Sequence, residues 1–334
     1  MRKITLYLLS AAIIAVGLIM IPNSERAVEA SAKAEIAMEL TTETIITEKN
    51  ADSKLPMAST TKIVTAIIII EDCSLDEIIT VHDSAVGVEG SSIYLKKDEK
   101  ISIKDLLYGL MLRSGNDSAV ALAIHHSGST EKFAEVMTQR AKAMGAENSE
   151  FKNPSGLPDD NHYTTAKDLC KIACHAMKNP VFKEIVSTTN YKGQFRSFVN
   201  KNKILKSYEG ANGVKTGYTL KAGRCLVSSA EQNGMDIVCV VLNCPEMYER
   251  SCEIFDYGFK NYKLLKLDEN KVFMCNNVLC KLKNTENLVI KISGEITYSI
   301  KPLSESNDNA IAELEIYREN NLLFTRKLYS ILDD

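Results

Sequence analysis

The sequence Pro56-Met57-Ala58-Ser59-Thr60-Thr61-Lys62 opens an apolar run that continues to Ile70. The β-branched residues of this run favour a strand, and its periodicity does not distinguish a strand from a buried helix. We predict a buried helix, because a helix stacks the Ser59 hydroxyl and the Lys62 amine, three residues apart, on one face. A serine beside an amine is the arrangement of a nucleophile with its base.

Two further motifs follow in order, Ser114-Gly115-Asn116 and Lys215-Thr216-Gly217. A Ser-x-x-Lys pair alone carries little weight, because Ser149-Glu150-Phe151-Lys152 is a second copy in the same chain. Each motif by itself also fits a surface or capping turn. Only the ordered set is specific, and it predicts a serine acyl-transfer site.

The catalytic roles follow from ordinary side-chain chemistry. Lys62 is predicted to take the proton of Ser59, which requires that burial and a second cation, Lys215, lower the pKa of Lys62. Ser114 offers a hydroxyl that can relay a proton to the departing amine. Lys215 is also expected to attract a substrate carboxylate.

The binding roles fall to neighbouring positions. Asn116 offers an amide that can hydrogen-bond a peptide backbone. Gly217 lacks a side chain, so we expect a substrate to lie along the strand that contains Thr216 and Gly217, as an added β-strand. The backbone N–H groups of Ser59 and Tyr218 are the predicted oxyanion donors.

Composition places the chain among ordinary globular proteins. Its 334 residues are 45% hydrophobic and 25% charged, and the formal net charge of -3 gives no support for a nucleic-acid partner. Nine cysteines are an odd number in scattered positions, so no disulfide framework follows. Cys170, Cys174 and His175 have no second ligand pair, and we expect core thiols, with no metal or cofactor.

The segment 1–32 predicts an exported protein, held at the extracellular face or in the cell wall. Two basic residues precede an apolar stretch from Ile4 to Ile21, and small residues follow at candidate cleavage positions, as in a secretory signal peptide. Cleavage after Ala30 and cleavage after Ala32 both fit this pattern. An uncleaved membrane anchor stays open, because an apolar run of about 18 residues can span a bilayer.

The remaining chain predicts an α/β domain followed by β-rich sequence. The second motif is expected at a turn between two helices, with Asp117 or Ser118 capping the second helix. The loop 153–163 is expected to border a cleft. We place domain boundaries that divide the chain into a signal peptide (1–32), a catalytic domain (33–262) and a small β-rich domain (263–334). Within these parts the patterns predict strands near 34–48, 213–219, 224–229 and 236–242, and helices over 59–70, 103–112, 130–144 and 246–262. A capping box, Thr165-x-x-Asp168, opens one more helix.

Over roughly residues 35–262 the chain resembles the low-molecular-mass penicillin-binding proteins, which are serine-type D-alanyl-D-alanine carboxypeptidases. The resemblance is carried by five segments: Pro56-Met57-Ala58-Ser59-Thr60-Thr61-Lys62, Leu112-Arg113-Ser114-Gly115-Asn116-Asp117, Asn153-Pro154-Ser155-Gly156-Leu157, His162-Tyr163-Thr164-Thr165-Ala166 and Gly213-Val214-Lys215-Thr216-Gly217-Tyr218-Thr219.

The resemblance implies a transpeptidase/β-lactamase-like domain, whose antiparallel sheet is flanked by helices, and a small β-rich C-terminal domain. It implies removal of the terminal D-alanine from peptidoglycan stem pentapeptides through an acyl-enzyme, and acylation by β-lactam antibiotics. Arg250 falls where the family often has an arginine for the terminal carboxylate, and an exposed helix arginine is the alternative. Family members commonly end in an amphipathic membrane helix, which this sequence does not show after Ile331, so we expect release or weak membrane or wall association.

Three alternatives remain on the sequence alone. A D,D-endopeptidase needs only an open site. The common β-lactamases have Ser-Asp-Asn in the middle motif and a glutamate that activates water, whereas this chain has Ser114-Gly115-Asn116 and no glutamate in the loop 153–163. A non-catalytic peptidoglycan-binding protein is the third alternative, and the complete set of expected catalytic residues argues against it.

Overall fold

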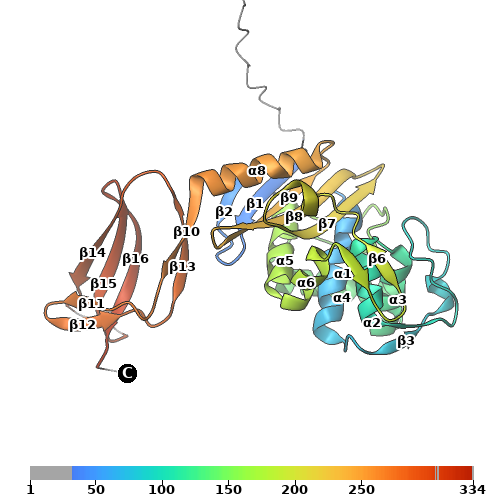
Figure 1. Ribbon diagram of the computed structural model, residues 1–334, viewed down its shortest axis with the longest axis horizontal. Helices are drawn as coiled ribbons and strands as arrows, with labels where there is room; N and C mark the ends of the chain where they lie inside the picture. The colour runs from blue at the N-terminus through green and yellow to red at the C-terminus, as the bar shows by residue number, and fades with distance from the viewer. Residues whose placement is uncertain (1–31, 305, 307, 333–334) are drawn as a thin grey trace, which may run out of the picture. The chain divides into compact units, whose positions relative to one another are not determined.

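The computed structural model describes residues 32–304, 306 and 308–332, so the predicted signal segment up to residue 31 lies outside the described residues. The first part of the described chain is built on a five-stranded antiparallel sheet in the order β2-β1-β9-β8-β7 (Figure 1). Helix α8 packs on one face of this sheet, and α5 packs on the other with the remaining helices around it. The predicted fold class, an antiparallel sheet flanked by helices, is confirmed.

The strands of this sheet lie close to the predicted ranges, and β7 is an edge strand because it pairs only with β8. Several shorter elements were not predicted from the sequence, among them α6, α7 and the β5–β6 hairpin. The elements of this part are β1 (Ala34–Glu39), β2 (Ile45–Lys49), η1 (Ala58–Thr61), α1 (Lys62–Asp72), β3 (Ile78–Thr80), η2 (Asp83–Ala85), β4 (Lys100–Ser102), α2 (Ile103–Leu112), α3 (Asn116–Ser127), α4 (Thr130–Ala143), α5 (Ala166–Lys178), α6 (Pro180–Ser187), β5 (Asn190–Lys192), β6 (Ser197–Val199), α7 (Ile204–Ser207), β7 (Ala211–Thr219), β8 (Gly223–Gln232), β9 (Met235–Leu242) and α8 (Met247–Asn261).

Helix starts follow side-chain capping, with one correction. Ser102, Ser129 and Thr165 accept hydrogen bonds from the backbone N–H three residues later, which satisfies a free donor at the start of α2, α4 and α5. The cap of α3 is Gly115, and the expectation that Asp117 or Ser118 caps this helix is wrong. The Asp117 carboxylate is used by a neighbouring loop instead.

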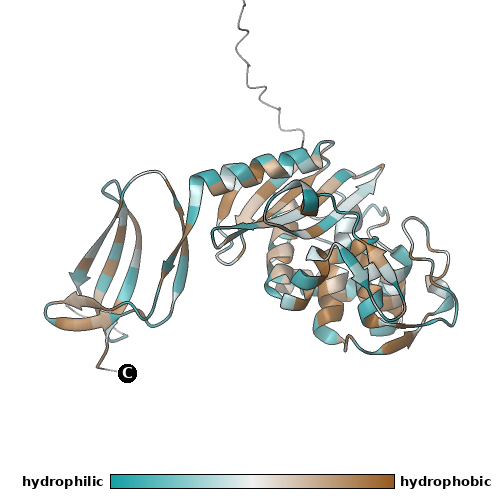
Figure 2. Ribbon diagram, in the orientation of Figure 1, coloured by the Kyte–Doolittle hydropathy of each residue, from teal (hydrophilic) through white to brown (hydrophobic). Residues whose placement is uncertain are grey.

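Helix α1 forms the centre of the core beneath the sheet. Residues 62–69 are all buried, so the isoleucine run is apolar on every side and is enclosed by other helices and by the sheet. Figure 2 shows hydrophobic residues along the strands of the sheet, while the outward side of α8 is largely hydrophilic. Burial on all sides explains why periodicity could not distinguish a helix from a strand here.

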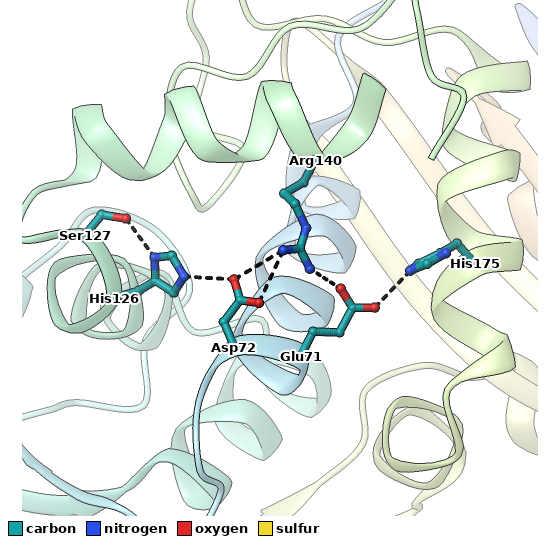
Figure 3. A network of polar contacts seen from close by, with 6 residues as sticks. All are labelled: Glu71, Asp72, His126, Ser127, Arg140 and His175. Carbon is teal, nitrogen blue, oxygen red and sulfur yellow. Dashed lines mark hydrogen bonds and ion pairs between the residues drawn. The ribbon is translucent and has the colours of Figure 1, made fainter. Parts of the chain in front are cut away.

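A polar network fixes the far end of α1 (Figure 3). The carboxylates of Glu71 and Asp72 both bind Arg140 of α4, His126 of α3 bonds Asp72 at 3.1 Å, and His175 of α5 bonds Glu71 at 2.8 Å. Acidic groups at a helix C-terminus oppose the helix dipole, and these cationic and imidazole partners offset that cost. The network therefore joins three helices to the helix that begins with Lys62.

After α8 the described chain is almost entirely β-structure. A two-stranded pair, β10 with β13, is followed by an antiparallel sheet in the order β11-β12-β16-β15-β14, with its own apolar cluster. These strands are β10 (Tyr262–Leu267), β11 (Phe273–Cys275), β12 (Val278–Lys281), β13 (Glu286–Lys291), β14 (Ile296–Pro302), β15 (Ala310–Arg318) and β16 (Asn321–Ser330).

Candidate active site

The predicted nucleophile and base meet where η1 runs into α1. Lys62 Nζ lies 3.0 Å from Ser59 Oγ. The predicted helix does not begin as an α-helix, because the hydroxyl and backbone N–H of Thr60 both bond back to the carbonyl of Met57, three residues earlier. This 3₁₀ turn places Ser59 at the surface of the cleft, while Lys62 is fully buried behind it.

The partners of the Lys62 amine determine what it can do. Its Nζ lies 2.7 Å from Asn116 Oδ1 and 2.5 Å from the backbone carbonyl of Ser155. Both of these oxygens can only accept, so they take two N–H bonds of the amine. Of the three partners only the Ser59 hydroxyl can also donate. A neutral Lys62 would therefore direct its lone pair at the Ser59 proton.

The electrostatics favour that neutral amine. Burial is the main cause that holds the pKa of Lys62 well below its usual value, and the charge of Lys215 acts in the same direction, against a smaller opposing effect of Asp117. Burial also lowers the pKa of Lys215 to about 7, with a contribution from the charge of Lys201. The charge of Lys215 therefore adds to burial in disfavouring the protonation of Lys62.

The second motif lies on the predicted turn between α2 and α3. Ser114 has a left-handed backbone, with φ of 65°, and its side chain borders the cleft. Asn116 is buried at the start of α3, where Oδ1 accepts from Lys62 and Nδ2 donates to the carbonyl of Glu89 at 2.6 Å. Asn116 was predicted to bind substrate, and in the structure these internal contacts leave one amide N–H for that purpose.

Asp117, next to the motif, fastens the loop that forms one wall of the cleft. Its buried carboxylate accepts from Ser92 Oγ at 2.6 Å and from the backbone N–H groups of Ile93 and Leu95 at 3.0–3.1 Å. These bonds satisfy the charge of the carboxylate in a buried place. Ser91, immediately before the fastened segment, borders the cleft.

The third motif lies on the edge strand β7. Lys215 is buried, and its Nζ donates to the backbone carbonyl of Thr216 at 2.8 Å. A side chain at Gly217 would place its Cβ 3.0 Å from both the Met57 carbonyl oxygen and the Ser59 backbone nitrogen. The backbone that requires this glycine is therefore that of the nucleophile turn, in addition to any substrate along the strand. The same approach brings Ser59 N–H beside the strand residues that precede Tyr218.

These elements enclose a cleft of about 610 Å³. Two of its lining residues, Ser59 and Ser114, come from the predicted catalytic set, and β7 supplies three more. The cleft is lined by Ser59, Ser91, Ser114, Lys201, Thr216, Gly217, Tyr218, Arg224, Met247 and Tyr248, and none of them is acidic.

Arg250, which was predicted to bind substrate, pairs with two carboxylates of the protein itself. Its guanidinium forms two hydrogen bonds to Glu35, at 2.7 and 2.9 Å, and one to Glu253 at 2.8 Å. Glu35 lies on β1 and its side chain is only 3% exposed, so Arg250 is the group that neutralises this buried carboxylate. The residue is not among those that line the cleft, so its contacts in the structure do not support the prediction that it binds substrate.

Residues of the loop 153–163 hold Lys62 and its neighbour Thr61, and the sequence did not reveal these contacts. His162 receives a hydrogen bond from the backbone N–H of Lys152 at Nδ1 and lies 2.8 Å from Thr61 Oγ1 through Nε2, so the neutral imidazole carries its proton on Nε2. Burial lowers the pKa of His162 to about 4. Asn153 folds the adjacent loop by accepting three backbone N–H bonds, which presents the Ser155 carbonyl to Lys62. The loop 153–163 had been expected to border a cleft, and the segments Asn153–Leu157 and His162–Ala166 carried the family resemblance, but Asn153, Ser155 and His162 had been assigned no role at Lys62.

Among the described residues no group of histidines, cysteines and acids is arranged to hold a metal ion. Cys170 and Cys174 are buried in α5, and His175 points to Glu71 (Figure 3). No helix in the described part of the chain is both long and apolar enough to cross a membrane.

Comparison with known proteins agrees with this site. The sequence matches the D-alanyl-D-alanine carboxypeptidase family over residues 21–246. It is 30% identical to the D-alanyl-D-alanine carboxypeptidase DacF of Bacillus subtilis over 323 residues, which cover 89% of this chain and 82% of the relative. It is 34% identical to the D-alanyl-D-alanine carboxypeptidase of Streptomyces sp. (strain K15), over 67% of this chain and 85% of that protein.

The structure is similar to penicillin binding protein 5 from Haemophilus influenzae, with a TM-score of 0.77 at 25% identity over 90% of this chain and 97% of that one. This match includes the β-rich C-terminal part, because it extends well beyond residue 246. The chain belongs to the D-alanyl-D-alanine carboxypeptidase family, the low-molecular-mass penicillin-binding proteins that act through a serine.

Proposed function

We propose that this serine D-alanyl-D-alanine carboxypeptidase removes the terminal D-alanine from peptidoglycan stem pentapeptides through an acyl-enzyme on Ser59. The observation that carries the proposal is the environment of the Lys62 amine. Two oxygens that can only accept hold its N–H bonds, its third partner is the Ser59 hydroxyl, and burial lowers its pKa well below the usual value. A lysine held in this way can act as a base near neutral pH.

In the first half-reaction, Ser59 Oγ attacks the carbonyl carbon of the penultimate D-alanine and passes its proton to Lys62 Nζ. The backbone N–H groups of Ser59 and Tyr218 are proposed to stabilise the oxyanion. The peptide bond then breaks, and the proton reaches the leaving amine through the Ser114 hydroxyl. Water attacks the resulting ester, Lys62 takes its proton, and Ser59 is restored.

Binding is assigned to the edge strand. The peptide is proposed to lie along β7 beside Thr216 and Gly217. The positive charge of Lys215 is proposed to attract the carboxylate of the substrate. A β-lactam presents a carbonyl and a carboxylate in a similar relation, so acylation of Ser59 by these antibiotics is part of the proposal. No cofactor is needed for these steps.

The alternative activities are weaker on specific grounds. The loop 153–163 has no glutamate to activate the deacylating water, so rapid β-lactam hydrolysis is not expected. An endopeptidase would use the same residues on a longer leaving group. The complete catalytic set argues against a purely binding role.

The setting of the enzyme is also a proposal. We propose an exported protein with a signal peptide over residues 1–32, a catalytic domain over 33–262 and a β-rich domain over 263–334. The relatives named carboxypeptidases support an enzyme of the cell wall, and weak association with the wall or membrane is compatible with this division.

The test is release of D-alanine from N-acetyl-lysyl-D-alanyl-D-alanine by the purified protein and by Ser59→Ala. We expect release by the wild type and none by the variant, and covalent labelling by a fluorescent penicillin should disappear with it. D-alanine release by Ser59→Ala would contradict the assignment of the nucleophile. A folded wild type that labels with penicillin and releases no D-alanine would contradict the substrate.

A further inference from the structure

The cleft contains more positive charge than the three motifs account for. Lys215 of the third motif is buried, and the lining of the cleft itself includes Lys201 and Arg224, which are both exposed. No acidic residue is part of the lining, so these charges are not neutralised within the cleft. A cavity with this composition favours an anionic ligand group.

Arg224 is held at one side of the cleft by its backbone. It is the second residue of β8, lies directly opposite Tyr218 of β7, and its carbonyl accepts from the N–H of Cys244 at 2.8 Å. Cross-strand partners project to the same side of a sheet, so Arg224 and Tyr218 stand together at the end of the strand that carries the third motif. Tyr248, which also borders the cleft, is fixed by a hydrogen bond to its hydroxyl from the N–H of Lys203 at 3.3 Å.

The guanidinium of Arg224 has no carboxylate partner within the described residues. This distinguishes it from Arg250, whose guanidinium binds Glu35 and Glu253. Lys215 is buried and already donates to the Thr216 carbonyl. Arg224 is therefore the arginine in this cleft that is free to form a planar, two-bond contact with an incoming carboxylate.

We propose that Arg224 is the specificity-determining residue that binds the free terminal carboxylate of the substrate, the role that the sequence had assigned to Arg250. The proposal rests on the proposed carboxypeptidase function. It deepens that function because it explains how the enzyme selects a free D-alanyl terminus over a peptide that continues or is amidated. Lys201 faces the same cleft and is the competing candidate.

The test compares N-acetyl-lysyl-D-alanyl-D-alanine with the same peptide ending in a C-terminal amide. For both peptides, kcat/KM is measured from the formation of N-acetyl-lysyl-D-alanine by wild type, Arg224→Gln, Arg224→Lys and Lys201→Gln. Arg318→Gln, on β15, removes one arginine charge far along the chain and serves as the control. Equal thermal midpoints establish that the variants fold.

We expect Arg224→Gln to lower kcat/KM for the acid by about 10- to 100-fold and to leave the amide nearly unchanged, because a charge-assisted contact is lost with the acid alone. Arg224→Lys should retain part of the preference for the acid over the amide, and Arg318→Gln should retain all of this preference. The rate of acylation by benzylpenicillin, compared with the rate of acylation by its methyl ester, measures the same preference for a free carboxylate. This second comparison is the test if the peptide amide is not turned over at a measurable rate.

An unchanged acid-to-amide ratio in Arg224→Gln would overturn the proposal, as would an equal loss on both peptides. The proposal would also be overturned if the ratio of kcat/KM for the acid to that for the amide fell in Lys201→Gln and persisted in Arg224→Gln. That result would assign the binding of the carboxylate to Lys201. These results are distinct from failure of the proposed function, in which the wild type itself would release no D-alanine.

Discussion

Replacing Lys215 by methionine should change how the stability of the protein depends on pH. Lys215 is fully buried, and its pKa in the folded protein is lowered from 10.5 to about 7. In the unfolded chain the amine is hydrated and titrates near its ordinary value. At low pH the buried positive charge of Lys215 therefore lowers the free energy of unfolding. This destabilisation disappears as the pH rises and the amine in the folded protein loses its proton.

The sign and size follow from proton linkage. Between about pH 7 and pH 10.5 the unfolded chain holds a proton on Lys215 that the folded protein does not, so stability rises with pH over this range. Each pH unit contributes about 1.4 kcal/mol, so the two units from pH 7 to pH 9 contribute about 2.7 kcal/mol. Below pH 7 both states are protonated, and the full cost, about 5 kcal/mol for the difference of about 3.5 between the two pKa values, is present.

Urea unfolding of wild type and Lys215→Met at pH 6, 7, 8 and 9 measures this effect. The free energy of unfolding of the variant relative to wild type should fall by about 2.7 kcal/mol from pH 7 to pH 9 and stay level below pH 7. Taking the difference between proteins cancels other titrating groups that the substitution does not touch. Lys206→Met, at an exposed position on α7, is the matched control and should show no such slope.

A difference between Lys215→Met and wild type that is flat from pH 6 to pH 9 would refute the reasoning. It would mean that Lys215 keeps its proton throughout, with a counter-ion or water that offsets burial. The assignment of Lys62 as a neutral base would not be weakened by this result, because a Lys215 that stays charged continues to lower the pKa of Lys62.

Three further changes test other parts of the structure. Gly217→Ala adds a Cβ 3.0 Å from the Ser59 nitrogen, so acylation by a fluorescent penicillin should slow by about 10²-fold, the cost of losing one oxyanion donor; an unchanged rate would contradict the proposed oxyanion site. Glu35→Ala leaves Arg250 without its buried partner and should lower the free energy of unfolding by about 3 kcal/mol with the acylation rate retained; slow acylation in the folded variant would return Arg250 to the active site. His162 has a pKa lowered to about 4 from 6.5, so the folded protein should lose about 3 kcal/mol as the pH falls from 6.5 to 4, and urea titrations of His162→Gln should show less of this acid loss.

Local patterns made much of the site predictable from the sequence. The spacing of Ser59 and Lys62 fixes their proximity within one turn, and strand and helix signals around Lys215 and Thr165 depend on neighbouring residues alone. The family resemblance supplied the antiparallel sheet and its flanking helices, which such local patterns cannot give. Predictions based on these features agree with the elements and contacts observed.

The features that were missed depend on contacts between distant segments. Arg250 binds Glu35, which is 215 positions away in the sequence, and no local pattern records that pairing. The Ser155 carbonyl that holds Lys62 is a backbone group, so its residue type gives no signal. Arg224 reaches the cleft because β8 pairs with β7 in one register, and a shift by one residue would turn it to the other face.

The active site contains backbone conformations and buried amines that lower the stability of the fold. Ala58 and Ser114 both have left-handed backbones, with φ of 49° and 65°, and each such residue costs about 1–2 kcal/mol. They stand directly before the nucleophile and within the second motif, close to the buried amine of Lys62. The sum of these costs is offset elsewhere, by the buried residues 62–69 of α1 and by the polar network at the far end of that helix. Because α1 is anchored at both ends, its first residue cannot relax away from Ser59. The enclosed helix therefore keeps the Lys62 amine, whose pKa burial lowers, 3.0 Å from the Ser59 hydroxyl.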